Sequence, residues 1–237
     1  LADSVAPAGV AVLTRVQSLL LAPHVALAEA GVPVDSILDE GVLDRLGVRA
    51  ALAYLRIAID PARISGGDLS EVHRRPSRGL PQWATKWLDR CRSIDDVRRA
   101  AARIDDARVA SKLDDLALDL DRLAQLASRG ASARALLTAV RDDIGLGSAM
   151  TLLDSTGAAS SSHLDDLEAL VQVADLHPEA ATFELWLRRA FHRERAASGV
   201  TLSTIHRVKG REWDRVVVFG VSDGLMPHRL ASDVEEE

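Results

Sequence analysis

Apolar and polar positions divide this chain into strand-like segments at both ends and a long helical middle. Near the C-terminus, residues 200–205 alternate between two faces, and residues 216–219 form an unbroken apolar run. Alternation is typical of a strand, and the unbroken run predicts a strand buried on both faces. Near the N-terminus, residues 10–13 and 32–38 predict two more strands. A helix over residues 17–30 separates them and ends at Gly31. This crossover unit needs partner strands elsewhere in the chain to form a sheet.

The middle of the chain has helical spacing throughout. Residues 154–162 are the most loop-like segment, and Ser162 with Asp165 is expected to cap the helix that follows. The expected buried stripes comprise Val97, Ala100, Ala101 and Ile104; Leu113, Leu116, Ala117, Leu120 and Leu123; Leu136, Leu137 and Val140; and Phe183, Trp186, Leu187, Ala190 and Phe191.

A polar loop separates the two C-terminal strands. It carries His206, Arg207, Lys209, Gly210, Arg211 and Glu212. Parallel sheets bind their ligands at the strand-end edge where this loop is expected to lie. From spacing alone, a ligand site and a solvated loop between two core strands are equally compatible with the pattern.

Composition limits the possible functions. The 237 residues include 47% hydrophobic and 27% charged residues, which is typical of a folded globular protein. Cys91 is the single cysteine, so an internal disulfide is impossible and a reducing cytoplasmic environment is expected. No apolar run is long enough for a membrane span, and no signal peptide is visible. The net charge of −6 means that any contact with DNA requires a local basic patch.

One basic patch lies between residues 73 and 92. There, Arg74, Arg75, Arg78, Lys86, Arg90 and Arg92 are accompanied by a single acid, Asp89. The turn at Gly79 precedes a predicted helix, and such a turn suits a phosphate. A solvated basic loop fits equally well. The acids between residues 105 and 121 interleave with basic residues, which favours a solvated helix face over a metal site, and we predict no metal ligands.

A longer string resembles a known family. Thr204-x-His206-x-x-Lys209-Gly210-x-Glu212, followed by an apolar strand and by Asp223-Gly-Leu-Met-Pro-His228, resembles motif V and the succeeding block of UvrD, Rep and PcrA-type superfamily 1 DNA helicases. Residues 11–18 and 51–57 are similar to the start of the second RecA-like lobe of the same group. The richness of the chain in Ala, Arg, Asp and Leu favours an actinobacterial UvrD-like branch.

This resemblance implies an α/β RecA-like partial lobe, with a parallel sheet from both termini and a large all-α insertion. The expected domains are residues 1–40 with 198–237 for the lobe, and residues 41–197 for a regulatory insertion that contacts duplex DNA. The resemblance implies three groups of site residues: Lys209, Gly210 and Glu212 for nucleotide; Thr204, His206, Pro227 and His228 for single-stranded DNA; and Arg75, Arg78, Gly79 and Leu80 for duplex DNA. Pro81 replaces the second glycine of the family's duplex-contacting turn and removes one N–H donor.

The implied function is a fragment of an ATP-dependent 3′-to-5′ DNA helicase of repair or replication, associated with the nucleoid. The full-length protein would use ATP and Mg²⁺, a partner N-terminal RecA-like lobe, DNA with a single-strand to duplex junction, and repair or transcription proteins. The chain has no Gly-x-x-x-x-Gly-Lys-[Ser/Thr] loop, so we expect it to bind no cofactor and to be inactive alone. The alternative is a helical protein-docking or autoinhibitory module with little affinity for DNA.

Overall fold

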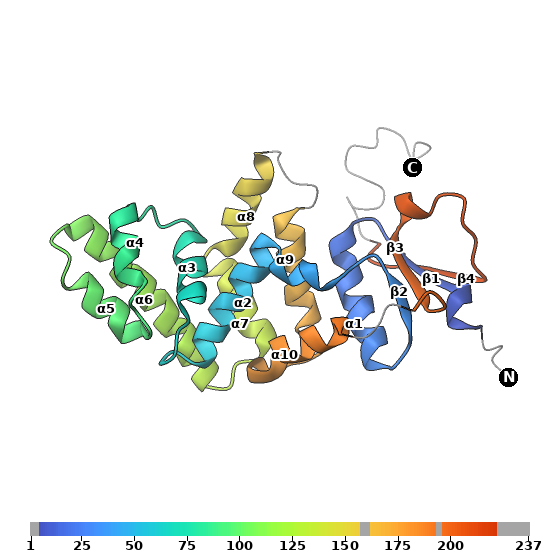
Figure 1. Ribbon diagram of the computed structural model, residues 1–237, viewed down its shortest axis with the longest axis horizontal. Helices are drawn as coiled ribbons and strands as arrows, with labels where there is room; N and C mark the ends of the chain where they lie inside the picture. The colour runs from blue at the N-terminus through green and yellow to red at the C-terminus, as the bar shows by residue number, and fades with distance from the viewer. Residues whose placement is uncertain (1–4, 157–161, 193–195, 222–237) are drawn as a thin grey trace. The chain divides into compact units, whose positions relative to one another are not determined.

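The structure is a computed structural model that describes residues 5–156, 162–192 and 196–221 (Figure 1). The chain forms two compact units, Leu1–Val42 with Leu187–Glu237, and Leu43–Trp186. The unit boundaries thus lie at 42/43 and 186/187, where the sequence analysis expected 40/41 and 197/198. The functional roles of the two parts remain predictions.

Both ends of the chain contribute strands to one parallel sheet. The strands are β1 (Val10–Thr14), β2 (Val34–Ser36), β3 (Val200–Thr204) and β4 (Arg215–Val218), and their order is β2-β3-β1-β4. β1 pairs with β3 from Ala11↔Thr201 to Thr14↔Thr204, and β4 and β2 pair parallel on the outer sides. The predicted fold class, a parallel α/β lobe with a helical insertion, is confirmed.

Short helices complete this unit. They are the 3₁₀ helices η1 (Pro7–Gly9), η2 (Gln17–Leu20) and η4 (Ile205–Val208), and the α-helix α1 (Leu21–Glu29). Gly31 ends α1 as predicted: its φ is 73°, and the amides of Gly31 and Val32 donate to the carbonyls of Ala28 and Leu27. This left-handed turn satisfies carbonyls that the helix end would leave unpaired.

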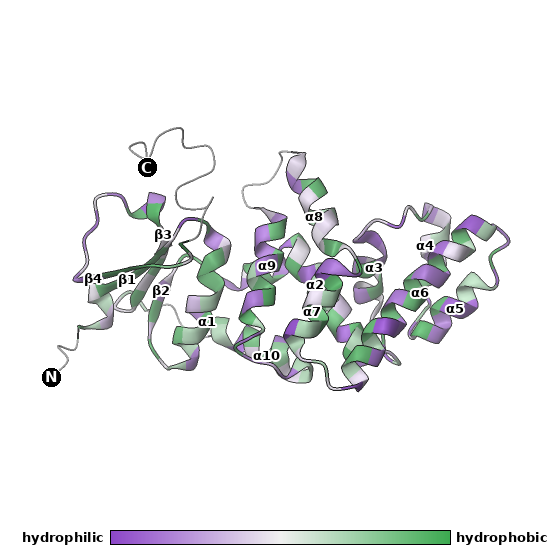
Figure 2. Cartoon of the chain, turned by 180° about the vertical axis from the view of Figure 1, so that it is seen from behind, coloured by the Kyte–Doolittle hydropathy of each residue, from purple (hydrophilic) through white to green (hydrophobic). Residues whose placement is uncertain are grey.

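The prediction that residues 216–219 form a strand buried on both faces is wrong. Val216, Val217 and Val218 of β4 are 49%, 49% and 44% exposed. β4 is the outermost strand of the described sheet and pairs only with β1 there. Its apolar residues, green in Figure 2, therefore lie on an edge strand. An apolar run predicts a strand, but it does not show which neighbours cover it.

The second unit is helical and is organised around α2 (Leu46–Ile59), whose residues from Ala50 to Leu55 are all buried. Tyr54 within it donates its hydroxyl proton to the Val72 carbonyl at 2.9 Å. The other elements are η3 (Glu40–Asp44), which spans the unit boundary, α3 (Gly66–Arg74), α4 (Gln82–Leu88), α5 (Ile94–Ala101), α6 (Ala107–Ser128), α7 (Ala133–Asp142), α8 (Leu146–Ser155), α9 (His163–Val173) and α10 (Ala180–Phe191), which crosses the second boundary.

The predicted stripes match the buried faces of these helices with few departures. All five predicted residues of α6 and all three of α7 are buried, and α6 carries polar residues on its other faces (Figure 2). Ile104 lies beyond the end of α5 and is half-buried, as are Trp186 and Phe191 in α10. Ser162 accepts from the Asp165 amide at 3.1 Å, which confirms the predicted cap of α9.

Candidate nucleic-acid interface

The polar loop predicted as a site begins at the carboxyl end of β3. Thr204 is the last residue of β3 and lies opposite Thr14, the last residue of β1. Parallel strands present their carboxyl ends at one edge of the sheet, where α/β folds bind ligands. The loop therefore lies where the sequence analysis expected it.

Apolar side chains hold this loop against the sheet. Val208 is buried in a cluster with Ala11 and Leu13, and Ile205 and Trp213 pack against that cluster partly buried. Ile205 and Val208 are three residues apart, so the 3₁₀ turn of η4 puts both on the inner side. His206 and Arg207 between them are exposed. The loop is thus fixed at three points, and its polar residues face solvent.

His206 meets a residue that the sequence analysis did not include among the site residues. Arg15, directly after β1, lies with its Nη1 3.2 Å from His206 Nε2. A guanidinium has only donors, so Arg15 is the donor when these two nitrogens form a hydrogen bond. The register of β1 and β3 brings these two residues together, and no sequence motif predicts that register. Arg15 and His206 form one polar group at the sheet edge.

The residues assigned to nucleotide lie farther along the same loop. Gly210 has a φ of 82° and open space around the position of a Cβ, so backbone conformation, not crowding, requires glycine here. Lys209 and Glu212 are exposed, and neither forms an ion pair with another described residue. Arg211 lies over the Trp213 ring, 5.0 Å from its centroid. Pro227 and His228 lie outside the described residues.

The predicted duplex-contacting residues lie in the helical unit, and two of them have carboxylate partners. Arg75 is 2.7 Å from Glu71. Arg78 is 2.8 Å from Asp119, and only 11% of its side chain is exposed. Gly79 adopts a φ of 59°, and its carbonyl accepts from Lys112 Nζ at 2.7 Å. Leu80 is half-buried. Their role in binding duplex DNA remains a prediction.

Arg78 belongs to a network inside the helical unit. Its Nη2 lies 3.5 Å from the Tyr54 hydroxyl, as well as beside Asp119. Burial raises the pKa of Tyr54. Burial disfavours the charge of Arg78, but its contacts with Tyr54 and Asp119 outweigh burial and raise its pKa. The geometry therefore gives Arg78 a packing role, which the basic composition of this stretch does not reveal.

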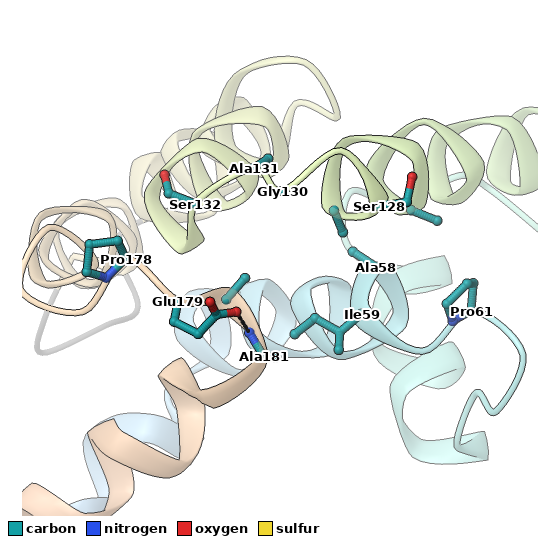
Figure 3. A pocket seen from close by; sticks show the side chains of 13 residues that line it. Ala58, Ile59, Pro61, Ser128, Gly130, Ala131, Ser132, Pro178, Glu179 and Ala181 are labelled. Atoms are coloured by element: carbon teal, nitrogen blue, oxygen red, sulfur yellow. Dashed lines mark hydrogen bonds between the residues drawn. The ribbon is translucent and has the colours of Figure 1, made fainter.

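A pocket of about 410 Å³ in the helical unit was not predicted (Figure 3). It lies among the ends of α2, α6, α7 and α10, and six of its thirteen lining residues are alanines. Glu179 is the one charged lining residue, and it accepts from the Ala181 amide at 3.4 Å. A ligand site normally adds several convergent polar groups to an apolar lining, so we assign no ligand to this pocket.

The described part of the chain shows neither a metal-binding cluster nor a membrane-spanning helix. Within residues 5–156, 162–192 and 196–221, no three His, Cys, Asp or Glu side chains come together in a way that suits a metal ion. No helix in those ranges is long and apolar enough to cross a membrane.

Comparison with known proteins agrees with this geometry. Residues 158–237 match the family model of the UvrD-like helicase C-terminal domain. The ATP-dependent DNA helicases UvrD2 of Mycobacterium bovis and Mycobacterium tuberculosis are 31% identical over 103 residues. The aligned part covers 37% of this chain and 15% of each helicase. The chain thus spans a small part of the length of these relatives.

The structure shows a parallel α/β unit formed by both ends of the chain, with a polar loop at its sheet edge, and a helical unit inserted between them. The family match shows that the C-terminal part of the chain, residues 158–237, is similar to UvrD-like helicase C-terminal domains. The resemblance to superfamily 1 helicases of the UvrD, Rep and PcrA type is therefore confirmed.

Proposed function

We propose that this chain is the second RecA-like lobe and the helical insertion of an ATP-dependent 3′-to-5′ DNA helicase of repair or replication. The observation that carries the proposal is the sheet edge, where Thr204, His206 and Arg15 lie at the ends of two paired parallel strands. Hydroxyl, imidazole and guanidinium groups suit the phosphates of a single strand. The same loop continues to Lys209, Gly210 and Glu212, which would contact nucleotide.

The nucleotide site needs a partner lobe. Gly210 lets a ligand approach the backbone closely, and the Glu212 carboxylate can accept from ribose hydroxyls. ATP supplies the free energy for translocation when it is bound. A triphosphate with Mg²⁺ also needs a phosphate-binding loop and further acidic ligands, and no Gly-x-x-x-x-Gly-Lys-[Ser/Thr] string occurs in the sequence. The 237-residue chain alone should therefore hydrolyse no ATP, and DNA-stimulated hydrolysis by it would contradict this proposal.

The DNA contact is tested by fluorescence anisotropy with a duplex that carries a single-stranded tail. Wild-type chain should bind, and binding should weaken as salt increases. Replacing His206 and Lys209 with alanine should weaken binding and lower the salt dependence, by about one unit of slope for each phosphate that is no longer neutralised. Arg103→Ala, which removes one exposed charge elsewhere, serves as the control. Equal weakening of DNA binding in the control, or unchanged DNA binding in the site variants, would contradict the proposal that the sheet edge binds DNA.

A protein-docking module is the second candidate. Two observations favour it: Arg75 and Arg78 are paired with carboxylates, and an apolar pocket of about 540 Å³ is lined by Leu46, Pro76, Met150, Leu152 and Leu153 among others. Leu152 is 70% exposed beside it. If the chain is a docking module, the anisotropy experiment with the tailed duplex should show DNA binding that is absent or insensitive to salt.

A further inference from the structure

The helix α4 exposes two tryptophans outside its packed face. Trp83 is 47% exposed and Trp87 is 39% exposed, whereas Ala84 and Leu88 of the same helix are buried. The chain is poor in aromatic residues, at 3%. Large aromatic side chains are normally used for packing or for binding. α4 thus packs with its small and aliphatic side chains and leaves its tryptophans outside.

Two basic residues share the face that carries these tryptophans. Lys86, Trp87 and Arg90 lie three, four and seven positions after Trp83, so all four lie on one side of α4 and the turn that follows it. Lys86 and Arg90 are exposed and form no ion pair with a described residue. The nearest acid in sequence is Asp89, the C-cap of α4. The face therefore alternates aromatic rings with positive charges.

Both indole rings are partly exposed and lack an aromatic or cation–π partner among the described residues. Within the described ranges, neither ring stacks on another aromatic ring, and the cation–π contact found there joins Arg211 to Trp213 instead. A partner that matches this surface has flat rings to stack on the indoles and negative charges for Lys86 and Arg90. Nucleotides have both.

We propose that the α4 face, defined as Trp83, Lys86, Trp87 and Arg90, binds unpaired nucleotides by stacking. Bases inside a duplex already stack on each other and hide their faces, so the face selects single-stranded or frayed DNA over intact duplex. This inference rests on the proposed function in DNA binding. It differs from the predicted duplex contact in two ways. The DNA is bound by aromatic rings, and the DNA that is bound is single-stranded.

The experiment separates this face from the sheet edge. Anisotropy is measured in a His206→Ala, Lys209→Ala background, with a labelled oligothymidylate and a blunt duplex of equal length. Trp83→Ala and Trp87→Ala should each weaken oligothymidylate binding by about fivefold or more and leave duplex binding within about twofold. Trp83→Phe keeps a ring and should retain most of the affinity. Leu185→Ala removes a comparably exposed apolar side chain from α10 and should change nothing.

Each outcome has a distinct meaning. Oligothymidylate binding that survives removal of both tryptophans, equal weakening for the two probes, or no binding in the double-variant background overturns the inference and leaves the sheet-edge proposal intact. Failure of the unmodified chain to bind any DNA overturns both. Circular dichroism of each variant shows whether the helices remain folded, and the exposure of both rings predicts that they do.

Discussion

Two glycine turns in this protein, at Gly210 and at Gly79, both have positive φ but differ in their surroundings. Both glycines have positive φ values, 82° and 59°, and both lie in basic segments. Around Gly210, Lys209 is exposed and forms no ion pair with a described residue. Beside Gly79, Arg78 is held by Asp119. A basic segment thus indicates a binding surface only when its charges are not already used to hold the fold together.

Removing Arg78 tests this difference most strongly. Arg78→Ala removes the largely buried cation beside Asp119 and the Tyr54 hydroxyl, so the free energy of unfolding should fall by about 2–3 kcal/mol. This expected loss of unfolding free energy lies at or below the range for breaking a fully buried ion pair, because the Asp119 side chain is partly exposed. Urea denaturation measures the change. Arg122→Ala is the matched control, since Arg122 lies 3.7 Å from the same carboxylate but is 67% exposed, and its removal should cost less than about 1 kcal/mol. Equal effects would contradict the packing role of Arg78.

Substitution of the two glycines sharpens the comparison. Gly210→Ala and Gly79→Ala should each destabilise the protein by about 1 kcal/mol, because a Cβ disfavours positive φ. A Cβ on Gly210 meets open space, whereas one on Gly79 lies 3.2 Å from Lys112 Nζ. Gly79→Ala should therefore cost slightly more in urea denaturation. A stabilising effect of Gly210→Ala would show that its conformation is not strained.

Each unit contains a buried histidine that makes stability depend on pH. Burial lowers the pKa of His24, which stacks on Phe191 at 4.5 Å between ring centroids, and of His73, where Arg74 adds to the effect. The unfolded chain takes up protons near the ordinary value of 6.5 and the folded chain does not. Stability should be complete above pH 6.5 and should fall as the pH decreases below it.

The urea midpoint measured from pH 8 to 5 checks this dependence. His24→Gln and His73→Gln should each flatten part of the decline, and Arg103→Ala should leave it unchanged. A wild-type midpoint that is constant across this range would contradict the buried, neutral state of both rings.

The smallest expected effect is at the start of α5. The Arg92 amide, Arg99 and Ser93 all donate to Asp96 and lower its pKa to about 2. A lowered carboxyl pKa stabilises the fold above the ordinary value of 3.8, and this stabilisation is lost as the pH falls toward about 2. Asp96→Asn should therefore reduce the acid sensitivity of unfolding between pH 4 and 2, followed by circular dichroism. An unchanged acid transition would show that Asp96 does not contribute to the pH dependence of stability.

The sequence predicted local features well because they depend on nearby residues. The end of α1 at Gly31, the Ser162 cap and the buried stripe of α6 each follow from spacing within a few positions. The sheet depended on the resemblance as well, since only the family pattern joined the two ends of the chain.

The remaining features depend on contacts between distant residues. Asp119 and Arg78 are far apart in sequence, and Arg15 meets His206 only through the register of β1 and β3. The exposure of β4 depends on its edge position, which its apolar residues do not indicate. The exposure of the Trp83 and Trp87 rings likewise depends on how α4 packs, which the sequence does not show.

Hydrogen exchange of the backbone amides gives the most direct test of the sheet edge as a site for single-stranded DNA. Addition of an oligothymidylate should slow exchange between residues 204 and 212, and high salt should abolish the effect. The buried helix α2 should show no change. Unaltered exchange across this loop, in a chain whose anisotropy shows that the oligonucleotide is bound, would contradict the account.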